Sequence, residues 1–195
     1  MGFYGSGAAS VAGVILAGGR GSRMGGEDKG LVAYYGKPLY QHVLERLQPQ
    51  VEHVYISANR NLTLYQQSGV PVIIDTLPDF PGPLAGMLAA LQTVDSEWLA
   101  FASCDTPELP QDLVQRLWQQ KGEAPVVWAA TPDRDHPTLA LLHRSIAPTL
   151  ADFLARGERK VMLFLQQAGG HAVLFDDAEA FRNINRPEDL TREKR

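Results

Sequence analysis

Two short runs that are apolar on both faces constrain the fold of this chain more than any other feature. Val11–Ala17 and Trp98–Ser103 contain almost no polar side chain, so neither alternates as a strand with one face in water does. Such runs are typical of inner strands in a sheet that helices cover on both sides. Similar apolar or β-branched runs predict strands at Val51–Ser57, Val70–Ile74, Pro125–Ala130, Thr138–Leu142 and Ala172–Phe175.

The segments between these runs place apolar residues at positions i, i+3 and i+4, which indicates amphipathic helices. They are Leu39–Leu47, Leu62–Gln67, Leu84–Val94, Asp112–Gln120, Ile146–Ala155 and Arg159–Ala168. Strands that alternate with helices predict an α/β fold of three layers, with a doubly wound, mostly parallel, Rossmann-like sheet in the middle. No internal repeat or shift in composition divides the chain. We therefore expect a flexible leader at residues 1–10 and a single domain at residues 11–195.

The composition excludes several classes of function. The chain has 195 residues and a formal net charge of -4, which argues against nucleic acid or an anionic membrane as its main partner. Its single cysteine, Cys104, rules out an intramolecular disulfide and a cysteine-ligated metal cluster, and it fits a cytoplasmic setting. No apolar run reaches the roughly 18–20 residues that span a bilayer.

A glycine-rich segment follows the first apolar run, at the edge of the sheet where ligands bind in open α/β folds. It extends from Leu16 to Lys29 and reads LAGGRGSRMGGEDK. Its glycines allow backbone N–H groups to approach phosphate oxygens, and Arg23 and Lys29 can neutralise phosphate charge. The spacing matches neither a Walker A loop nor the dinucleotide-binding G-x-G-x-x-G pattern. The segment predicts a triphosphate-binding loop, with an ordinary glycine-rich surface loop as the alternative.

Two aspartates follow other predicted strands and should reach the same edge of the sheet. Asp105 comes shortly after Trp98–Ser103, and Asp75 comes directly after Ile74. A carboxylate that meets triphosphate oxygens is a natural Mg²⁺ ligand, although Asp105 is also placed to cap the next helix. Asp75 offers two acceptors that match the adjacent N1–H and N2–H₂ donors of guanine. Contact with ribose, or a turn-forming role, is equally open for Asp75.

Motifs along nearly the whole chain resemble the molybdenum cofactor guanylyltransferases, the MobA family within the nucleotide-diphospho-sugar transferase-like nucleotidyltransferases. Beyond the loop they are Gly30-Leu31, Gly36-Lys37-Pro38-Leu39, Ser57-Ala58-Asn59-Arg60, Pro81-Gly82-Pro83-Leu84-Ala85-Gly86, Cys104-Asp105-Thr106-Pro107, Asp135-His136-Pro137-Thr138, Gly157-Glu158-Arg159 and Asn183-Ile184-Asn185-Arg186-Pro187. The resemblance implies an enzyme that transfers GMP from GTP to the terminal phosphate of Mo-molybdopterin and releases pyrophosphate. It also implies Mg²⁺ as cofactor, held by Asp105, and transient docking with the proteins that supply and receive the molybdenum cofactor.

The resemblance further suggests which residues form the site. The expected catalytic residues are Arg23, Lys29 and Asp105. The expected nucleotide- and cofactor-binding residues are Leu16, Ala17, Gly18, Gly19, Lys29, Ser57, Asn59, Asp75, Gly82, Asp105, Asn183 and Asn185. Ser57 stands where relatives may carry an asparagine, so Asn59 is a second candidate for the contact made there.

Polar residues of the C-terminal half are candidates for the acceptor. Arg134–Thr138 precedes a predicted strand, and Arg156, Arg159 and Lys160 offer positive charge. His136 is interpreted as a positioning or structural residue rather than a general base, because a phosphate acceptor is already ionised at neutral pH.

Three rival functions stay open at this point. They are a sibling enzyme that uses CTP, one that activates a sugar phosphate, and a non-catalytic nucleotide sensor or carrier.

Overall fold

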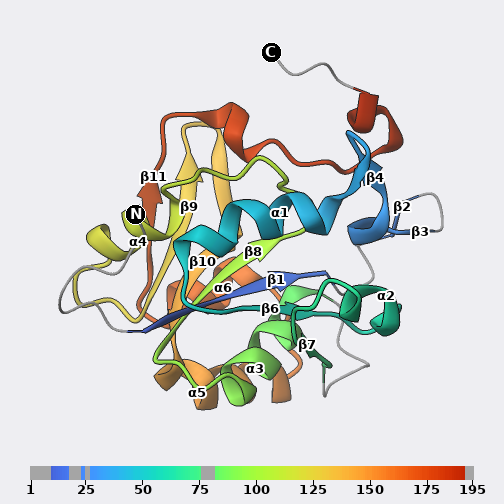
Figure 1. The fold of residues 1–195 in the computed structure, drawn as a ribbon. Coiled ribbons are helices and arrows are strands. Elements are labelled where there is room, and N and C mark those ends of the chain that lie inside the picture. The colour runs from blue at the N-terminus through green and yellow to red at the C-terminus, as the bar shows by residue number, and fades with distance from the viewer. Residues whose placement is uncertain (1–9, 18–22, 25–26, 76–81, 192–195) are drawn as a thin grey trace.

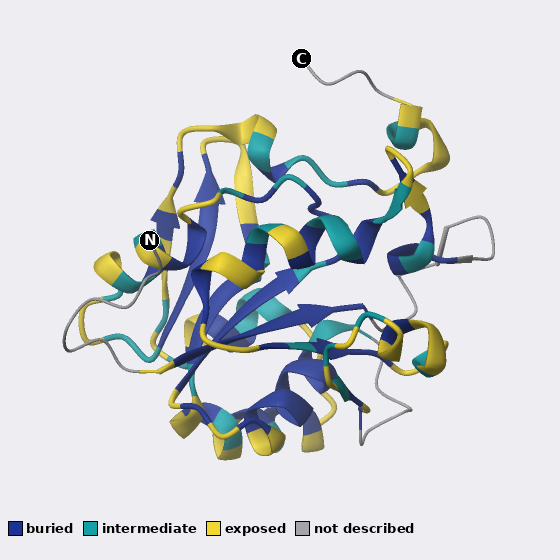
Figure 2. Ribbon diagram, in the orientation of Figure 1, coloured by how far each residue is buried: buried dark blue, intermediate teal, exposed yellow. Residues whose placement is uncertain are grey.

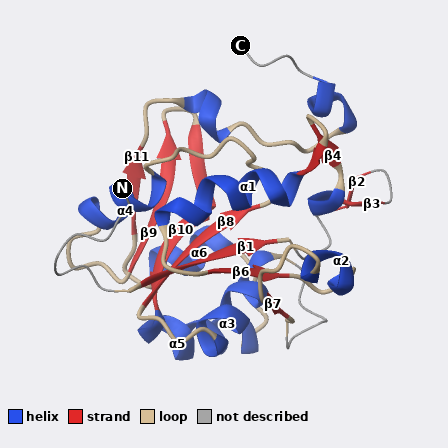
Figure 3. Ribbon diagram, in the orientation of Figure 1, coloured by secondary structure: helices blue, strands red, loops and turns tan. Residues whose placement is uncertain are grey.

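A computed structural model describes residues 10–17, 23–24, 27–75 and 82–191, with only the backbone at residues 23, 24 and 27. Within these residues a seven-stranded sheet has the order β11-β9-β10-β8-β1-β6-β7 (Figures 1 and 3). The strands are β1 (Val11–Leu16), β6 (Val54–Ser57), β7 (Val72–Ile73), β8 (Trp98–Ser103), β9 (Val126–Thr131), β10 (Arg134–His143) and β11 (His171–Leu174). Only β10 runs antiparallel to its neighbours, so the predicted doubly wound, mostly parallel α/β fold is confirmed.

Helices cover both faces of the sheet (Figure 1). They are α1 (Leu39–Leu47), α2 (Leu62–Gln66), α3 (Pro83–Thr93), α4 (Leu113–Gln120), α5 (Ala147–Ala155) and α6 (Val161–Gln167). The helices α1 and α4 pack into one hydrophobic core, and α3, α5 and α6 pack into the other. Strand β1 serves both, since Val11 and Ile15 face the first core while Val14 and Leu16 face the second. Figure 2 shows the result, a central strand that is buried along its whole length.

Short elements that the hydrophobic periodicity did not predict connect the larger ones. Two small hairpins pair β2 (Arg23–Met24) with β3 (Glu27–Asp28), and β4 (Ala33–Tyr34) with β5 (Lys37–Pro38). The 3-10 helices are Lys29–Leu31, Gln48–Gln50, Arg144–Ile146, Ala178–Phe181 and Pro187–Thr191. They are too short for a sequence period to reveal them.

The expectation that Arg134–Thr138 precedes a strand is wrong. These residues form the beginning of β10, where Arg134, Asp135 and His136 pair with the end of β9. The pairing register shifts between His136 and Ala140, which accommodates Pro137 within the strand. The sequence did not predict this part of the strand because its residues are polar. Its pairing with β9 places these residues at the edge of the sheet where the other strands end.

Ser10, the last residue of the predicted leader, makes two hydrogen bonds to the body of the protein. The Ser10 carbonyl accepts a hydrogen bond from the Trp98 amide, and the Ser10 hydroxyl donates to Glu52 at 2.6 Å. Residues 1–9 lie outside the described part of the chain, so the prediction about them stays a prediction. Among the described helices, none is both long and apolar enough to cross a membrane.

After β11 the chain crosses the carboxyl edge of the sheet as residues 175–191, which we call the C-terminal strap (red in Figure 1). Phe175 and Phe181 are buried in the core that contains α1 and α4. Ile184 is fully buried in a small separate cluster with Val32, Tyr34 and Leu39. The strap is therefore attached to the body of the protein by apolar side chains at several points.

Replacing Ile184 with alanine should destabilise the protein, because it removes the side chain that fixes the strap in the small cluster. We expect a loss of about 2–5 kcal/mol in the free energy of unfolding, measured by denaturant titration. Leu174→Ala is the control, since Leu174 is 53% exposed and its truncation should change stability by less than about 0.5 kcal/mol. Equal effects of the two substitutions would contradict the anchoring role of Ile184.

Candidate active site

The phosphate loop leaves the sheet between the ends of two neighbouring strands. The Ala17 amide donates to the Ser57 carbonyl at 2.9 Å, and the Cys104 amide donates to the Leu16 carbonyl at 3.2 Å. Leu16 and Ala17 are thus held at the carboxyl edge, between β6 and β8. Gly18, Gly19 and the side chain of Arg23 lie outside the described part of the structure, so their roles stay predictions.

Lys29 lies at the far end of the loop and is 5% exposed. Its ammonium nitrogen donates to Asn185 Oδ1 at 3.2 Å and lies 3.9 Å from Asp105 Oδ2. The structure therefore joins three predicted site residues from the loop, the end of β8 and the C-terminal strap. The buried ammonium group places a positive charge at the end of the loop, and the nearby Asp105 carboxylate balances that charge.

Asp105 is tied to the strap through both its backbone and its side chain. Its carbonyl accepts from the Ile184 amide at 2.8 Å, and Thr106 Oγ1 lies 3.3 Å from Asp105 Oδ1 and 3.1 Å from Asn183 Oδ1. Because Ile184 is buried on one side, Asn183 and Asn185 both turn toward the site. The alternative role of Asp105 as a helix cap is wrong, since α4 begins at Leu113 with Asp112 at its N-cap.

A second group of predicted residues lies at the ends of β6 and β7. Asp75 and Ser57 are buried, and the Asp75 amide donates to Asn59 Oδ1 at 3.3 Å. Asn59 thus holds the backbone of Asp75 in place. Gly82 precedes α3 with φ of 95°, which favours glycine, and a Cβ built there meets no atom of the described residues within 4 Å.

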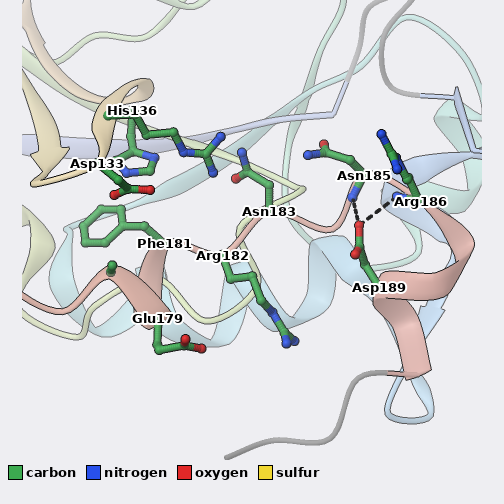
Figure 4. A pocket seen from close by; sticks show the side chains of 11 residues that line it. Asp133, His136, Glu179, Phe181, Arg182, Asn183, Asn185, Arg186 and Asp189 are labelled. Atoms are coloured by element: carbon green, nitrogen blue, oxygen red, sulfur yellow. Dashed lines mark hydrogen bonds between the residues drawn. The ribbon is translucent and has the colours of Figure 1, made fainter.

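A cavity of about 460 Å³ lies along the strap, beside the Lys29–Asp105 pair. Figure 4 shows its lining, which consists of Asp133, Arg134, His136, Ala178, Glu179, Phe181, Arg182, Asn183, Asn185, Arg186 and Asp189. Three arginines supply positive charge, and the carboxylates of Asp133, Glu179 and Asp189 balance it. Arg182 donates to the Tyr34 hydroxyl at 2.9 Å. Asp189 accepts from the amides of Asn185 and Arg186, each at 3.0 Å, which fixes the strap at this end of the cavity. Arg156, Arg159 and Lys160, by contrast, are exposed between α5 and α6 and lie outside this lining.

His136 forms part of the cavity wall and is buried. Its ring stacks on Phe181 with centroids 4.7 Å apart, and its Nε2 lies 2.8 Å from Thr131 Oγ1. The Thr131 hydroxyl donates to the Asp133 carboxylate, so His136 Nε2–H is the donor toward Thr131. Burial lowers the pKa of His136 from its usual value, and the nearby Arg134 lowers it further. His136 is therefore neutral at pH 7.

Two residues in the site have roles that the sequence did not suggest. Thr106 links Asp105 to Asn183, and Asp28 accepts hydrogen bonds from three different residues beside Lys29. The sequence contains one indication of these roles, which is that Thr106 is adjacent to Asp105 and Asp28 is adjacent to Lys29. Their partners lie far away in sequence, so the signal could not be interpreted without the fold.

The sheet, the loop after β1 and the lysine–carboxylate pair at its edge define an α/β nucleotidyltransferase. A solved structure of CMP:2-keto-3-deoxy-manno-octonic acid synthetase complexed with CTP shares the fold, with a TM-score of 0.72 at 17% identity over 93% of this chain and 95% of that one. Molybdopterin-guanine dinucleotide biosynthesis protein A from Archaeoglobus fulgidus also has a TM-score of 0.72, at 26% identity over 92% and 94% of the two chains.

The chain belongs to the family of the MobA-like NTP transferase domain, whose profile matches residues 13–172. Molybdenum cofactor guanylyltransferase of Serratia proteamaculans (strain 568) is 55% identical to it over 183 residues, which is 93% of each chain. The enzyme of the same name from Yersinia pestis (strain Pestoides F) is 52% identical over 92% of this chain and 93% of its own length. The family resemblance inferred from the motifs is confirmed.

The buried neutral state of His136 predicts a pH dependence of stability. Its pKa is lower in the folded protein than the usual 6.5 or so of the unfolded chain, so the unfolded chain takes up the proton first as the pH falls. The free energy of unfolding should therefore decrease as the pH falls below about 6.5. His136→Gln keeps a donor for Thr131 but does not titrate, so its stability should decrease less between pH 7.5 and pH 5. Parallel pH profiles of the two proteins would show that His136 contributes nothing to this dependence.

Proposed function

We propose that this protein is a cytoplasmic molybdenum cofactor guanylyltransferase. It transfers GMP from GTP to the terminal phosphate of Mo-molybdopterin, releases pyrophosphate and forms molybdopterin guanine dinucleotide. The observation that carries the proposal is the contact of Lys29 with Asp105 and Asn185 at the end of the phosphate loop. The names of relatives that are 52–55% identical over nearly the whole chain support it.

The residues beside Lys29 fit a magnesium ion. The side chain of Asp105 is 22% exposed and offers a carboxylate. Two amide oxygens lie nearby: that of Asn185 accepts from Lys29, and that of Asn183 accepts from Thr106. Mg²⁺ prefers oxygen ligands and is usually held by one or two carboxylates together with substrate phosphates. A cluster of three or more acidic, histidine or cysteine side chains, which is absent from the described residues, is therefore not required. When bound, Mg²⁺ would neutralise negative charge on the triphosphate.

The nucleotide would extend from the loop toward the ends of β6 and β7. In this orientation the Lys29 ammonium group binds the phosphates, and the base lies beside Gly82 and Asp75. The Asp75 carboxylate would accept from guanine N1–H and N2–H₂, and Asn59 would hold Asp75 in position. Cytosine has no adjacent pair of ring and amino donors on its Watson–Crick edge, so this arrangement favours GTP over CTP.

The acceptor would occupy the cavity along the strap. Arg134 and Arg186 would bind the phosphate of the pterin, because guanidinium groups bind phosphate as bidentate donors. Asp133, Glu179 and Asp189 also line the cavity, so these contacts, and not an excess of positive charge, carry the assignment. Asn183 and Asn185 belong both to the cavity lining and to the Lys29–Asp105 network. In the proposed arrangement these two residues would bring the acceptor phosphate close to the α-phosphate of GTP.

The reaction needs no protein nucleophile or base. An oxygen of the acceptor phosphate forms a bond to the α-phosphorus of GTP while the bond from that phosphorus to the β-phosphate oxygen breaks. No proton has to be removed, because the acceptor phosphate is already ionised at neutral pH. The Nε2 of His136, which could otherwise act as a base, is hydrogen-bonded to Thr131. The contribution of the protein is to hold both substrates in line and to stabilise the charge on the pyrophosphate that leaves.

Asp105→Ala should reduce turnover by at least ~100-fold, because it removes the carboxylate from the charged centre of the site. Pyrophosphate release in the presence of GTP, Mg²⁺ and molybdopterin is the measurement. Asp95→Ala is the matched control, since Asp95 is a fully exposed aspartate paired with Arg144 at 3.8 Å. Near-wild-type turnover of Asp105→Ala at saturating Mg²⁺ would exclude Asp105 from the mechanism.

Calorimetric titration with GTP and with CTP separates this proposal from its nearest rival. We expect GTP to bind more tightly in the presence of Mg²⁺, and Asp75→Ala to reduce the difference. Tighter binding of CTP would favour a cytidylyltransferase. Nucleotide binding without pyrophosphate release, when molybdopterin is supplied, would favour a sensor or carrier, and release with a sugar phosphate would favour that class of acceptor. Docking with the proteins that supply and receive the cofactor is part of the proposal.

A further inference from the structure

Asp28 is a buried carboxylate that directly precedes Lys29 but contacts a different set of residues. It is 7% exposed. Its Oδ1 accepts from the Tyr65 hydroxyl at 2.9 Å and from the Gly30 amide at 3.3 Å, and its Oδ2 accepts from Asn61 Nδ2 at 3.1 Å. A buried carboxylate is stabilised by several donors of this kind.

Two of the three donors to Asp28, Asn61 and Tyr65, belong to α2 and its N-cap, and the third is the Gly30 amide of the 3-10 helix that Asp28 caps. Tyr65 is fully buried, and burial raises the pKa of its hydroxyl, so that the group stays a donor. Asn61 occupies the N-cap of α2 in the left-handed region, with φ of 54° and ψ of 34°, and its side chain makes no capping bond to that helix. The side-chain oxygen of an N-cap asparagine normally accepts a hydrogen bond from a backbone N–H in the first turn of its own helix. Here the Asn61 side chain donates to Asp28 instead.

The close approach of Tyr65 also explains the glycine after Lys29. A Cβ built on Gly30 would overlap the Tyr65 hydroxyl oxygen. Tyr65 in turn packs edge-on against Tyr40 of α1, with ring centroids 5.1 Å apart. Through Tyr65 the Asp28 carboxylate is thus connected to the packed body of the protein, while Asn61 binds it from the exposed N-terminus of α2.

Asp28 is next to Lys29 in sequence and pairs through its backbone with Arg23 in the β2–β3 hairpin. Lys29 and Arg23 are the two residues of the loop that are predicted to bind phosphate. The Lys29 side chain extends to Asp105 and Asn185, whereas the Asp28 side chain extends to α2. The chain is therefore held on the α2 side by Asp28 at the point where Lys29 enters the site.

We propose that Asp28 is a positioning residue, held by Asn61 and Tyr65, that sets where the Lys29 ammonium group stands relative to Asp105 and Asn185. The inference deepens the proposed function and rests on it, because Lys29 is assigned there to the triphosphate. Asp28 acts through Lys29 and has no contact with substrate.

Four variants test this role: Asp28→Ala, Asp28→Asn, Tyr65→Phe and, as a control, Val114→Ala. Asp28→Ala should lower kcat by ~30-fold or more, since a small displacement of a charged group is costly in phosphoryl transfer. Asp28→Asn should recover most of this loss, because its amide oxygen can still accept from Tyr65 and Gly30. Tyr65→Phe removes one donor only and should give an intermediate loss of kcat. This variant also tests the role of Asp28 if Asp28→Ala does not fold. Val114 is fully buried in α4, away from the site, so its truncation should lower Tm with kcat unchanged.

Binding of Mg·GTP by calorimetry shows whether Asp28 acts through Lys29. We expect Asp28→Ala and Lys29→Ala each to weaken binding, and the double variant to bind no more weakly than Lys29→Ala alone. Additive weakening would overturn the inference, as would a wild-type kcat in Asp28→Ala or an equal loss in Asp28→Asn. An inactive wild-type protein would instead contradict the proposed function, and the binding comparison would still decide the role of Asp28.

Discussion

The contact of the Lys29 ammonium group with Asp105 and Asn185 is the interaction on which the rest of the site depends. It joins the end of the phosphate loop, the end of β8 and the C-terminal strap, which are distant from one another in sequence. A buried ammonium group needs such partners, because leaving it without them would carry a large desolvation cost. The contact therefore stabilises the assembled site, and in the proposed function the same ammonium group binds the triphosphate.

The fold brings these three segments together by a simple arrangement. All strands except β10 end at the same edge of the sheet, and β10 begins there, so the loop, Asp75, Asp105 and the Arg134–His136 segment converge. The strap then crosses this edge and is fixed by Ile184 on its buried side. We propose that one half of the resulting site binds the nucleotide and that the other half, where three arginines and three carboxylates line the cavity, binds the acceptor. The two halves share Asn183 and Asn185.

The sequence predicted the sheet and much of the site because both depend on local patterns. The apolar runs at Val11–Ala17 and Trp98–Ser103 identify buried strands, and the carboxyl ends of such strands locate Asp105 and the loop. The extension of β10 to Arg134 could not be predicted, because its polar residues become a strand only through pairing with β9. The roles of Asp28 and Thr106 depend on Tyr65 and Asn183, whose positions are set by tertiary packing. Residue types alone do not establish the proposed guanine preference or the proposed pterin acceptor. Both proposals depend on the similarity to the family.

The most direct test of the account is to locate the nucleotide and the metal. A crystal structure with GTP and Mn²⁺ in place of Mg²⁺ would show the metal by its anomalous scattering. The account predicts manganese on the Asp105 carboxylate, triphosphate oxygens against Lys29, and guanine beside Asp75. A triphosphate bound instead in the cavity lined by Arg134, Arg182 and Arg186, with manganese away from Asp105, would contradict it.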